Sequence, residues 1–241
     1  MGNISNAVYL LGNNAPRTVV LNYLATACKR GFRRKHSAAA KKFSLFAKEH
    51  GFRHDWFSSN VPFWMEVIEQ YDLRNKPIRA LEIGSFEGLS ACFMLQQMPL
   101  AQLTCVDTWN GSDEHVGREE VRTLEQSFDR HVAPWHGRVS KRKMTSLHYL
   151  AALRPEERFD FIYIDGSHHA DDVMVDALIA FRQLQVGGVM ILDDYLWRYY
   201  PRSAENPARA INGFLRLVEG RFECVMAYRQ LILVKTAERS V

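Results

Sequence analysis

The chain has 241 residues, of which 47% are hydrophobic and 24% are charged, and its formal net charge is +4. This composition excludes a disordered or fibrous chain, and the length suits one large α/β domain with a short extension. The apolar run from Val19 to Leu24 is interrupted by Asn22 and is shorter than the roughly 20 residues that span a bilayer. We therefore expect no transmembrane helix.

The positive charge is confined to the N-terminus. Residues 1–48 carry nine of the 31 Lys and Arg and no Asp or Glu, so 22 basic and 27 acidic groups remain for the rest. We expect residues 1–75 to form a basic helical extension or lid, and residues 76–241 to form the main domain. Anionic lipid, nucleic acid or an acidic partner are alternative ligands of the basic run, but a solvated helical face is the favoured interpretation. Nucleic acid is the less favoured ligand because few aromatic residues interrupt the run.

The cysteines give no sign of disulfide or metal chemistry. Cys28, Cys92, Cys105 and Cys224 are widely spaced and form no CxxC pair. Reduced thiols are therefore expected. The opening residues also show no secretory signal pattern, so a cytoplasmic location is expected, and a homo-oligomer is an open alternative.

The first predicted element is a helix from Asn60, with Asn60 as its cap and Pro62 in its first turn. After it, apolar strands alternate with helices. Strands are predicted at 78–84, 101–109, 139–144, 159–165, 189–195, 222–228 and 230–236, and helices at 88–98, 118–132, from Thr145 or Ser146, from Asp171 and around 211–218. Gly187 and Gly188 are expected to break the chain before the fifth strand.

This order predicts a Rossmann-like, doubly wound α/β fold. The sheet is expected to be seven-stranded and mostly parallel, with a C-terminal antiparallel hairpin and an N-terminal helical extension. In such folds ligands bind at the carboxyl ends of the strands. The polar residues at these ends are therefore the candidate functional residues.

The first predicted strand runs into an E-x-G-x-x-x-G turn from Glu82 to Gly88. A dinucleotide fingerprint would need glycine where Phe86 stands, and a triphosphate loop would need a following lysine. Glu82 and Glu87 would also repel a pyrophosphate at this helix N-terminus. The two carboxylates suit a ligand that carries an ammonium and a sulfonium group.

The turn, helix and following strand resemble the first motif of the class I S-adenosylmethionine-dependent methyltransferases, and the resemblance extends over roughly residues 78–235. It implies that Glu82 and Gly84 lie beside the methionine part of the cofactor, that Ser90 bonds its carboxylate, and that Asp107 binds the ribose hydroxyls. Trp109 and the turn at 144–146 are expected to flank the adenine. The implied cofactor contacts are Glu82, Gly84, Ser85, Phe86, Gly88, Ser90, Asp107, Thr108, Trp109, Thr145, Ser146 and Asp165.

Three acids end two further strands, in YIDGSHH and ILDDY. Adjacent parallel strands would place Asp165, Asp193 and Asp194 together at the carboxyl edge of the sheet. Three carboxylates at close range need a compensating cation, and oxygen ligands favour Mg²⁺, Mn²⁺ or Ca²⁺. The alternative is that these acids cap helices or contact the cofactor, with Asp194 as a plain cap.

This constellation resembles the metal-dependent O-methyltransferases of the catechol and macrolide-sugar types. The resemblance implies Mg²⁺ at the acids, Asp165 as a catalytic residue, and His168 rather than His169 as general base. The implied substrate is a hydroxyl of a small molecule, such as a sugar, a glycoside or a phenolic compound. Three rival interpretations are a hydroxylase of the cephalosporin hydroxylase type, a cofactor-binding protein without catalysis, and a nucleic-acid methyltransferase.

The acceptor is expected to be recognised by three segments outside the two motifs. They are the segment before Ile78, the loop from Asn110 to Gly117, and the loop from Trp197 to Asn206. Trp197, Tyr199 and Tyr200 are expected to form an aromatic wall in the last loop, with packing as the alternative.

Overall fold

The computed structural model describes residues 2–28, 31–113 and 119–239. The chain divides into two compact units: unit 1 comprises residues 1–28 and 145–241, and unit 2 comprises residues 29–144. The helices of residues 1–75 are therefore shared between the units, and the predicted boundary near residue 75 stays a prediction. No helix of the described residues is long and apolar enough to cross a membrane.

The strands of the described chain form a mixed seven-stranded sheet in the order β3-β2-β1-β4-β5-β7-β6. The pairs β1–β2, β2–β3 and β4–β5 are parallel, and β5–β7 and β6–β7 are antiparallel. The predicted Rossmann-like fold with a C-terminal antiparallel hairpin is thus confirmed.

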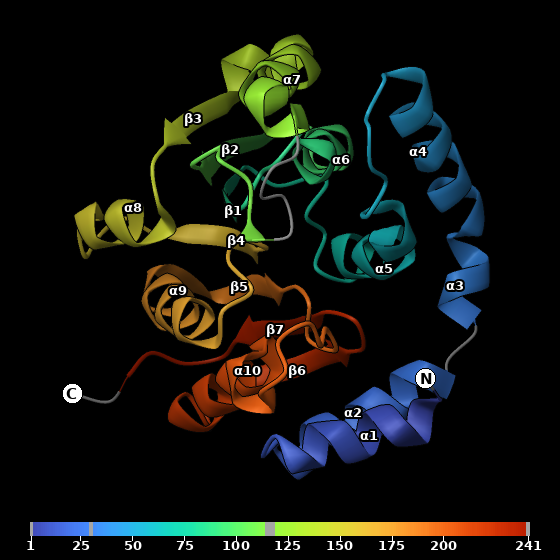
Figure 1. Ribbon diagram of the computed structural model, residues 1–241, viewed down its shortest axis with the longest axis vertical. Coiled ribbons are helices and arrows are strands. Elements are labelled where there is room, and N and C mark those ends of the chain that lie inside the picture. Colours follow the sequence, from blue (N-terminus) through green and yellow to red (C-terminus); the bar gives the residue numbers. More distant parts are fainter. Residues whose placement is uncertain (1, 29–30, 114–118, 240–241) are drawn as a thin grey trace. The chain divides into compact units, whose positions relative to one another are not determined.

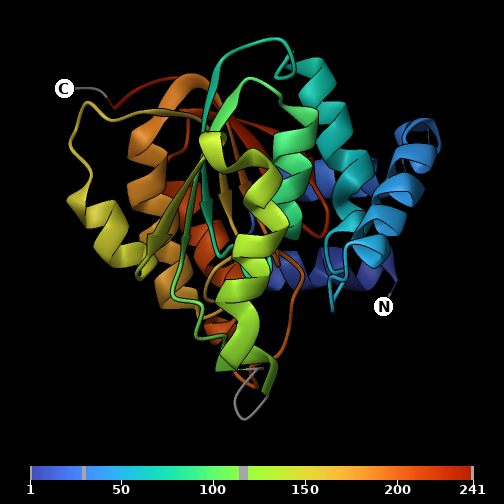
Figure 2. The same ribbon diagram turned by 90° about the horizontal axis from the view of Figure 1, so that it is seen from above.

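Unit 2 contains three parallel strands and the helices that pack around them (Figure 2). Its elements are α3 (Gly31–Lys35), α4 (Ser37–Glu49), η1 (Ser58–Asn60), α5 (Val61–Gln70), β1 (Ile78–Ile83), α6 (Leu89–Gln97), β2 (Ala101–Asp107), η3 (Glu119–Thr123), α7 (Leu124–Val132), η4 (Ala133–Arg138) and β3 (Val139–Lys143). Residues Leu89–Leu95 of α6 are all buried, because the helix lies against both β2 and α7.

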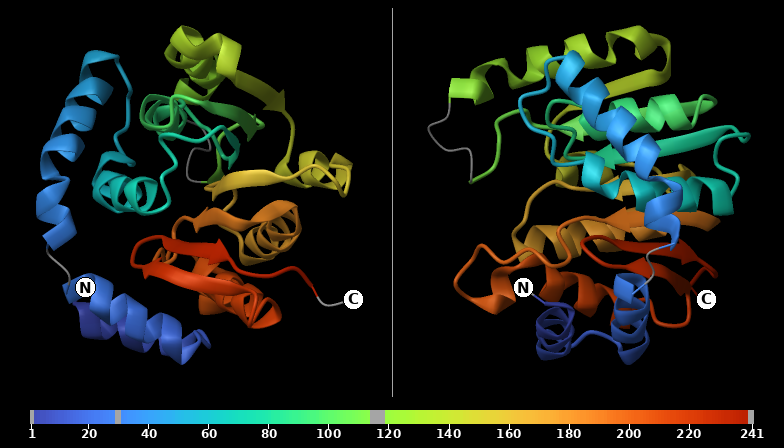
Figure 3. Two further views of the ribbon diagram at one scale, coloured as in Figure 1. Left: turned by 180° about the vertical axis from the view of Figure 1, so that it is seen from behind. Right: turned by 90° about the vertical axis from the view of Figure 1, so that its right-hand side faces the viewer.

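One helix start in unit 2 agrees with the prediction and another differs from it. Asn60 stands at the N-cap of α5, but its side chain makes no capping hydrogen bond, and Pro62 occupies the first turn. The helix expected from Arg118 begins at Leu124 after a 3-10 turn, and Arg118 lies outside the described residues. Leu124 and Phe128 are buried as the amphipathic pattern predicted, whereas Val121 is only half-buried. Helices α4 and α5 lie side by side in this unit (Figure 3).

Unit 1 contains the remaining strands, with α9 and α10 packed side by side (Figure 1). Its elements are α1 (Asn3–Gly12), α2 (Arg17–Cys28), α8 (Ser146–Ala152), β4 (Phe159–Ile164), α9 (Ala170–Gln183), β5 (Leu184–Leu192), η5 (Ser203–Glu205), α10 (Pro207–Leu217), β6 (Phe222–Ala227) and β7 (Leu231–Lys235). The strand residues Val189–Leu192 and Phe161–Ile164 are buried, so this part of the sheet carries much of the core.

The expected chain break at Gly187 and Gly188 is wrong. Both glycines lie within β5, where the register against β4 shifts between Phe159 and Phe161. Gly187 has a φ of +84°, which favours glycine, and a Cβ on Gly188 would lie 2.9 Å from the carbonyl oxygen of Gln185. The glycines therefore form a bulge that lets one strand continue instead of ending it.

Asn22 attaches α2 to the last hairpin of unit 1. Its Nδ2 donates to the carbonyl oxygens of Cys224 and Val225 at 2.9 and 3.2 Å, and its Oδ1 accepts from the backbone N–H of Ala227 at 2.8 Å. The pairing of β6 with β7 is irregular between Cys224 and Met226, so the side chain satisfies backbone groups that the sheet leaves unpaired. This explains why the polar Asn22 interrupts an apolar helix.

Candidate active site

The turn after β1 has a strained backbone. Gly84 and Gly88 have φ values of +86°, and Phe86 has a φ of +46°, which is uncommon for a residue with a side chain. A Cβ on Gly88 would lie 3.0 Å from the ring of Phe128 and 3.3 Å from Val132. Gly88 is thus required for the packing of α7 on the turn, and its contact with a cofactor stays a prediction.

Glu82 is a fully buried carboxyl at the end of β1. Its exposed fraction is 0%, and Ser90 donates its hydroxyl to Oε1 at 2.5 Å. Burial raises the pKa of Glu82 to about 7, although hydrogen bonds from Ser90, Ser85 and Cys105 oppose the shift. A cation bound beside Glu82 would restore its ionised form. The residue therefore fits the ammonium group of an amino acid.

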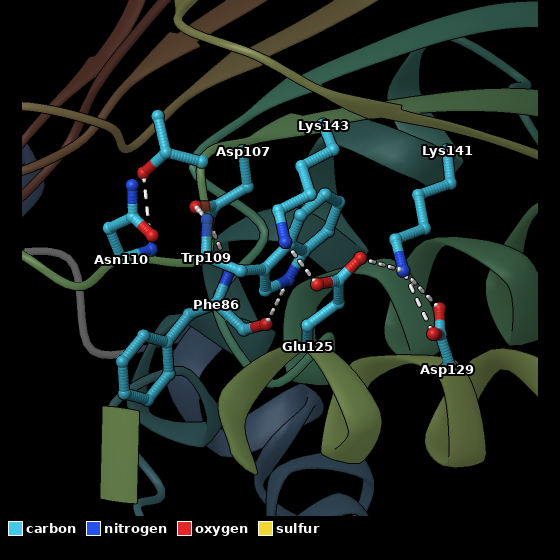
Figure 4. Close-up of polar contacts among 9 residues, drawn as sticks. Phe86, Asp107, Trp109, Asn110, Glu125, Asp129, Lys141 and Lys143 are labelled. Carbon is cyan, nitrogen blue, oxygen red and sulfur yellow. Dashed lines mark hydrogen bonds and ion pairs between the residues drawn. The ribbon is translucent and has the colours of Figure 1, made fainter. Parts of the chain in front are cut away.

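Asp107, at the end of β2, holds the turns after β1 and β2 together (Figure 4). Its Oδ2 accepts from the backbone N–H of Phe86 at 2.8 Å, and its Oδ1 accepts from that of Trp109 at 2.6 Å. Burial raises the pKa of Asp107, while these backbone hydrogen bonds oppose the rise. Backbone N–H groups of Ser85 and Thr108 also contact this carboxylate, so its role toward ribose hydroxyls stays a prediction.

Trp109 is packed between the turns after β1 and β2, and the adenine contact predicted for it stays a prediction. The side chain is 3% exposed, its ring lies 4.9 Å from that of Phe128, and Lys141 Nζ lies 4.8 Å from its centre. Its Nε1–H donates to the carbonyl oxygen of Phe86 at 2.9 Å (Figure 4). Trp109 therefore joins the same two turns that Asp107 joins. The neighbouring Thr108 accepts from the backbone N–H of Asn110 at 3.2 Å.

Glu87 is neutralised by a residue that the sequence interpretation missed. Arg53 Nε lies 2.8 Å from Oε1 of the buried Glu87, and the backbone N–H of Arg53 donates to Oε2 at 2.9 Å. Arg53 also donates to Ser127 at 2.7 Å. Glu87 is thus bound to the segment before α5, and only Glu82 retains the predicted role toward a cationic ligand.

Thr145 and Ser146 begin helix α8 of unit 1, as predicted. The backbone N–H of His148 donates to Thr145 Oγ1 at 3.2 Å, which makes Thr145 the N-cap. Ser146 hydrogen bonds to Asp176, whose burial raises its pKa to about 6. Both hydroxyls therefore have structural roles, and their contacts with a cofactor stay predictions.

The predicted acidic constellation forms at the ends of β4 and β5 in unit 1. Ile164 and Leu192 are register partners, and the backbone N–H of Asp193 donates to the carbonyl oxygen of Ile164 at 2.9 Å. Asp165, His168 and Asp194 each offer a ligand atom, and these atoms lie within 4.8 Å of one another. The same segments line a pocket with Val173 and Pro207. Parallel pairing thus brings the predicted residues together.

Asp193 lies behind this group rather than within it. Its Oδ2 accepts from Tyr163 and, at 2.7 Å, from Gln230, and its Oδ1 accepts from the backbone N–H of Asp194 at 2.7 Å. Burial, followed by the charge of Asp194, raises the pKa of Asp193. Tyr163 also contacts Asp165 Oδ2 at 2.8 Å. Direct ligation by Asp193 stays a prediction, and the sequence contained no sign of its bonds to Tyr163 and Gln230.

His168 is oriented by an acid and an aromatic ring. Its Nε2 lies 2.8 Å from Asp194 Oδ2, and its ring lies 4.6 Å from that of Trp197. His169 instead stacks on Tyr200, with the ring centres 4.4 Å apart. The geometry therefore places His168, and not His169, among the ligand atoms of Asp165 and Asp194, as the spacing predicted.

The donor set fits a divalent cation. The carboxylates of Asp165 and Asp194 supply negative charge and oxygen ligands, and the imidazole of His168 supplies a nitrogen ligand close to both. Asp194 has a φ of +55°, so the backbone after β5 turns sharply to present this side chain. Burial raises the pKa of Asp193 most and the charge of Asp194 adds to the rise, and a cation at the site would oppose both effects.

Residues 81–195 match the family model described as a methyltransferase domain, and this range contains both the glycine turn and the acidic strand ends. These residues are a methyltransferase domain. The O-methyltransferase hkm8 of Aspergillus hancockii is 27% identical over 138 residues, which are 55% of this chain and 50% of that protein. The uncharacterized protein R132 of Acanthamoeba polyphaga mimivirus is 25% identical over 131 residues, which are 51% of this chain and 54% of that protein. The chain thus spans about half the length of the curated relatives it matches.

Solved structures with a similar fold are also methyltransferases. MycE methyltransferase of the mycinamycin pathway, in complex with Mg and SAH, has a TM-score of 0.57 and 16% identity over 80% of this chain and 54% of its own. The O-methyltransferase TomG of Streptomyces achromogenes, in complex with SAM, has a TM-score of 0.55 and 15% identity over 90% of this chain and 96% of its own. At these identities the likeness shows the fold, and it agrees with the class I resemblance of the methyltransferase domain.

Proposed function

We propose that the chain is an S-adenosylmethionine-dependent O-methyltransferase that acts on a hydroxyl of a small molecule with the help of a divalent cation. The observation that carries the proposal is the grouping of Asp165, His168 and Asp194 within a matched methyltransferase domain. A sugar, a glycoside or a phenolic compound is the expected acceptor. A cytoplasmic location is part of the same proposal.

The cofactor would be held by the strand ends of unit 2. S-adenosylmethionine supplies a methyl group on a positively charged sulfur. Glu82 is the buried acid that suits the cofactor's ammonium group, and Asp107 is the acid at the end of β2, where the ribose of a nucleoside would lie. Structures of similar fold are described in complex with SAH or SAM, which supports this choice of cofactor.

The cation would be held by Asp165 and Asp194, with Asp193 supporting the site from behind. A divalent cation supplies positive charge that lowers the pKa of an acceptor hydroxyl. An unassisted alcohol holds its proton about as tightly as water, whose pKa is about 15.7, so a side chain alone would remove it poorly. The presence of Mg in the described MycE complex supports this proposal.

His168 would accept the proton of the acceptor hydroxyl at Nδ1, because Nε2 donates to Asp194 Oδ2. The imidazole is the group whose ordinary pKa, about 6.5, allows it to accept a proton near neutral pH. Asp194 Oδ2, at 2.8 Å, orients the ring and stabilises its protonated form, and Trp197 limits its rotation. Removal of the proton leaves an acceptor oxygen with the electron pair that methyl transfer requires.

Chelation tests this proposal directly. Incubation with methyl-labelled S-adenosylmethionine and a panel of polyols, glycosides and phenols should give O-methylated products. EDTA should lower the rate on the order of 100-fold or more, and excess Mg²⁺ should restore it. Activity that survives complete chelation would exclude the cation. A hydroxylated product without label would instead identify the hydroxylase chemistry.

A further inference from the structure

Aromatic side chains gather on the loop that follows β5, next to His168 and His169. The ring of Trp197 lies 4.6 Å from His168 and 5.2 Å from Tyr199, with which it is stacked. Tyr200 stands edge-on to Trp197 at 5.4 Å and stacks on His169 at 4.4 Å. Tyr199 is 57% exposed. A continuous row of rings thus leads from the acidic site to the surface of unit 1.

Asn206 holds the backbone of this aromatic loop. The residue is 2% exposed, and its Oδ1 accepts from the backbone N–H groups of both Tyr199 and Tyr200 at 3.0 Å. Its Nδ2 donates to the carbonyl oxygens of Tyr200 and Arg202 at 2.9 and 3.2 Å. One buried amide therefore fixes four backbone groups, which makes the exposed ring of Tyr199 a pre-organised surface.

Helix α1 holds the same loop from another direction. The guanidinium carbon of Arg198 lies 3.6 Å from the centre of the Tyr9 ring, and Nη2 donates to Asn6 Oδ1 at 2.8 Å. Ser203 donates its hydroxyl to Asn13 Oδ1 at 2.9 Å. These contacts join the first helix of the chain to residues nearly 200 positions later. Helix α1 therefore fixes the position of the loop that follows β5.

We propose that Trp197 and Tyr199 form a platform that binds the ring of the methyl acceptor, and that α1 positions this platform through Tyr9 and Arg198. The inference rests on the proposed function and adds the residues that would select a phenolic or sugar ring over an acyclic acceptor. Flat aromatic faces stack on such rings and do little for an extended, acyclic polyol. Trp197 contacts both Tyr199 and His168, so the platform adjoins the proposed base.

Ligand binding to the full chain tests the platform. With S-adenosylhomocysteine and Mg²⁺ present, we expect catechol and methyl β-D-glucopyranoside to bind more tightly than the acyclic polyol sorbitol. Tyr199→Ala should weaken binding of the two ring probes about 3- to 10-fold, and Tyr199→Phe should retain it. Leu217→Ala, a change at a 61% exposed position on α10, is the control and should bind as the unmodified chain does.

A second pair of variants tests the role of α1. Tyr9→Ala removes the ring beneath Arg198, and Tyr9→Phe retains it. We expect Tyr9→Ala to raise the acceptor KM about 3-fold or more with little change in kcat, and Tyr9→Phe to restore the original KM. A thermal unfolding scan of each variant separates this effect from general loss of structure.

The outcomes distinguish the platform from the proposed function. A chain that binds S-adenosylhomocysteine but neither ring probe, or whose Tyr199→Ala variant binds both probes normally, would overturn the platform and leave the methyltransferase proposal in place. Binding of the ring probes without methyl transfer to any acceptor would overturn the proposed function instead. Equal KM values for Tyr9→Ala and Tyr9→Phe would exclude the positioning role of α1.

Discussion

The glycine turn of unit 2 and the acidic site of unit 1 handle buried charge in opposite ways. In the glycine turn, Asp107 is bound by backbone N–H groups and Glu87 by Arg53. In the acidic site, Asp193 and Asp165 share the hydroxyl of Tyr163, and Asp194 pairs with a histidine. A hydroxyl has one proton, so it can donate to only one carboxylate at a time. In the first site the partners are backbone N–H groups and a guanidinium, whereas in the second they include a phenol, an amide and an imidazole.

The difference suggests that the glycine turn orients a large ligand and that the acidic site binds a cation. A site whose groups are already paired can hold a large ligand in one orientation without rearranging. A site with crowded acids is tuned to bind a cation, and the cation then completes it. Glu82 is intermediate, because its hydroxyl partners do not offset burial and its pKa stays at about 7.

The largest expected effect is that of a change in the acidic site. Asp165→Asn removes one charge from the cation site, and we expect methyl transfer to fall on the order of 100-fold, about 2.7 kcal/mol of transition-state stabilisation. Affinity for S-adenosylhomocysteine, measured by calorimetry, should change far less, because Glu82 and Asp107 are intact. Asp172→Asn, which changes an exposed acid in the first turn of α9, is the matched control. Equal losses of methyl transfer in the two variants would show that the loss does not depend on the acidic site.

An effect of similar size, on stability instead of catalysis, is expected from pH through Glu82. Its pKa in the folded chain, about 7, lies above the unfolded value of 4.5, so the unfolded chain binds fewer protons between these values. The free energy of unfolding without ligand should therefore fall as pH rises from 5 to 8, by up to ~3 kcal/mol from this residue. Asp176, at about 6, contributes in the same direction.

Urea unfolding at pH 5 and pH 8 measures this dependence, and Glu82→Gln should flatten it. Affinity for S-adenosylmethionine should show the opposite trend, because the ammonium group favours ionised Glu82 and binding should strengthen as pH rises through 7. Identical pH profiles for the variant and the unmodified chain would show that Glu82 is not the group responsible.

The smallest effect is expected from Trp109→Phe, which retains an aromatic ring but removes the 2.9 Å hydrogen bond to Phe86. The net contribution of such a bond is about 1 kcal/mol. We expect a roughly 5-fold weaker affinity for S-adenosylhomocysteine, because the turns after β1 and β2 become less firmly joined. Trp135→Phe, in η4, is the control and should leave the affinity unchanged. A larger effect at Trp135 would argue against a positioning role for Trp109.

The sequence alone predicted the elements whose signals are local. The alternation of apolar strands and helices, the helix that begins at Ser146 and the hairpin of β6 and β7 are all present. The placement of Asp165 and Asp194 at adjacent strand ends was also predictable, because parallel pairing aligns carboxyl ends whatever the side chains are. These features depend on periodicity and strand order, both of which can be read from neighbouring residues.

Only the tertiary structure decided which partner each polar group takes. Arg53 and Glu87 are 34 positions apart, Gln230 and Asp193 are 37 apart, and Arg198 and Asn6 are 192 apart. No local pattern specifies such pairs, because they depend on how packed elements bring distant side chains within hydrogen-bond distance. For the same reason, the sequence placed the acids at the strand ends, while packing determined that Asp193 turns toward Tyr163 and that Asp165, His168 and Asp194 face a common point.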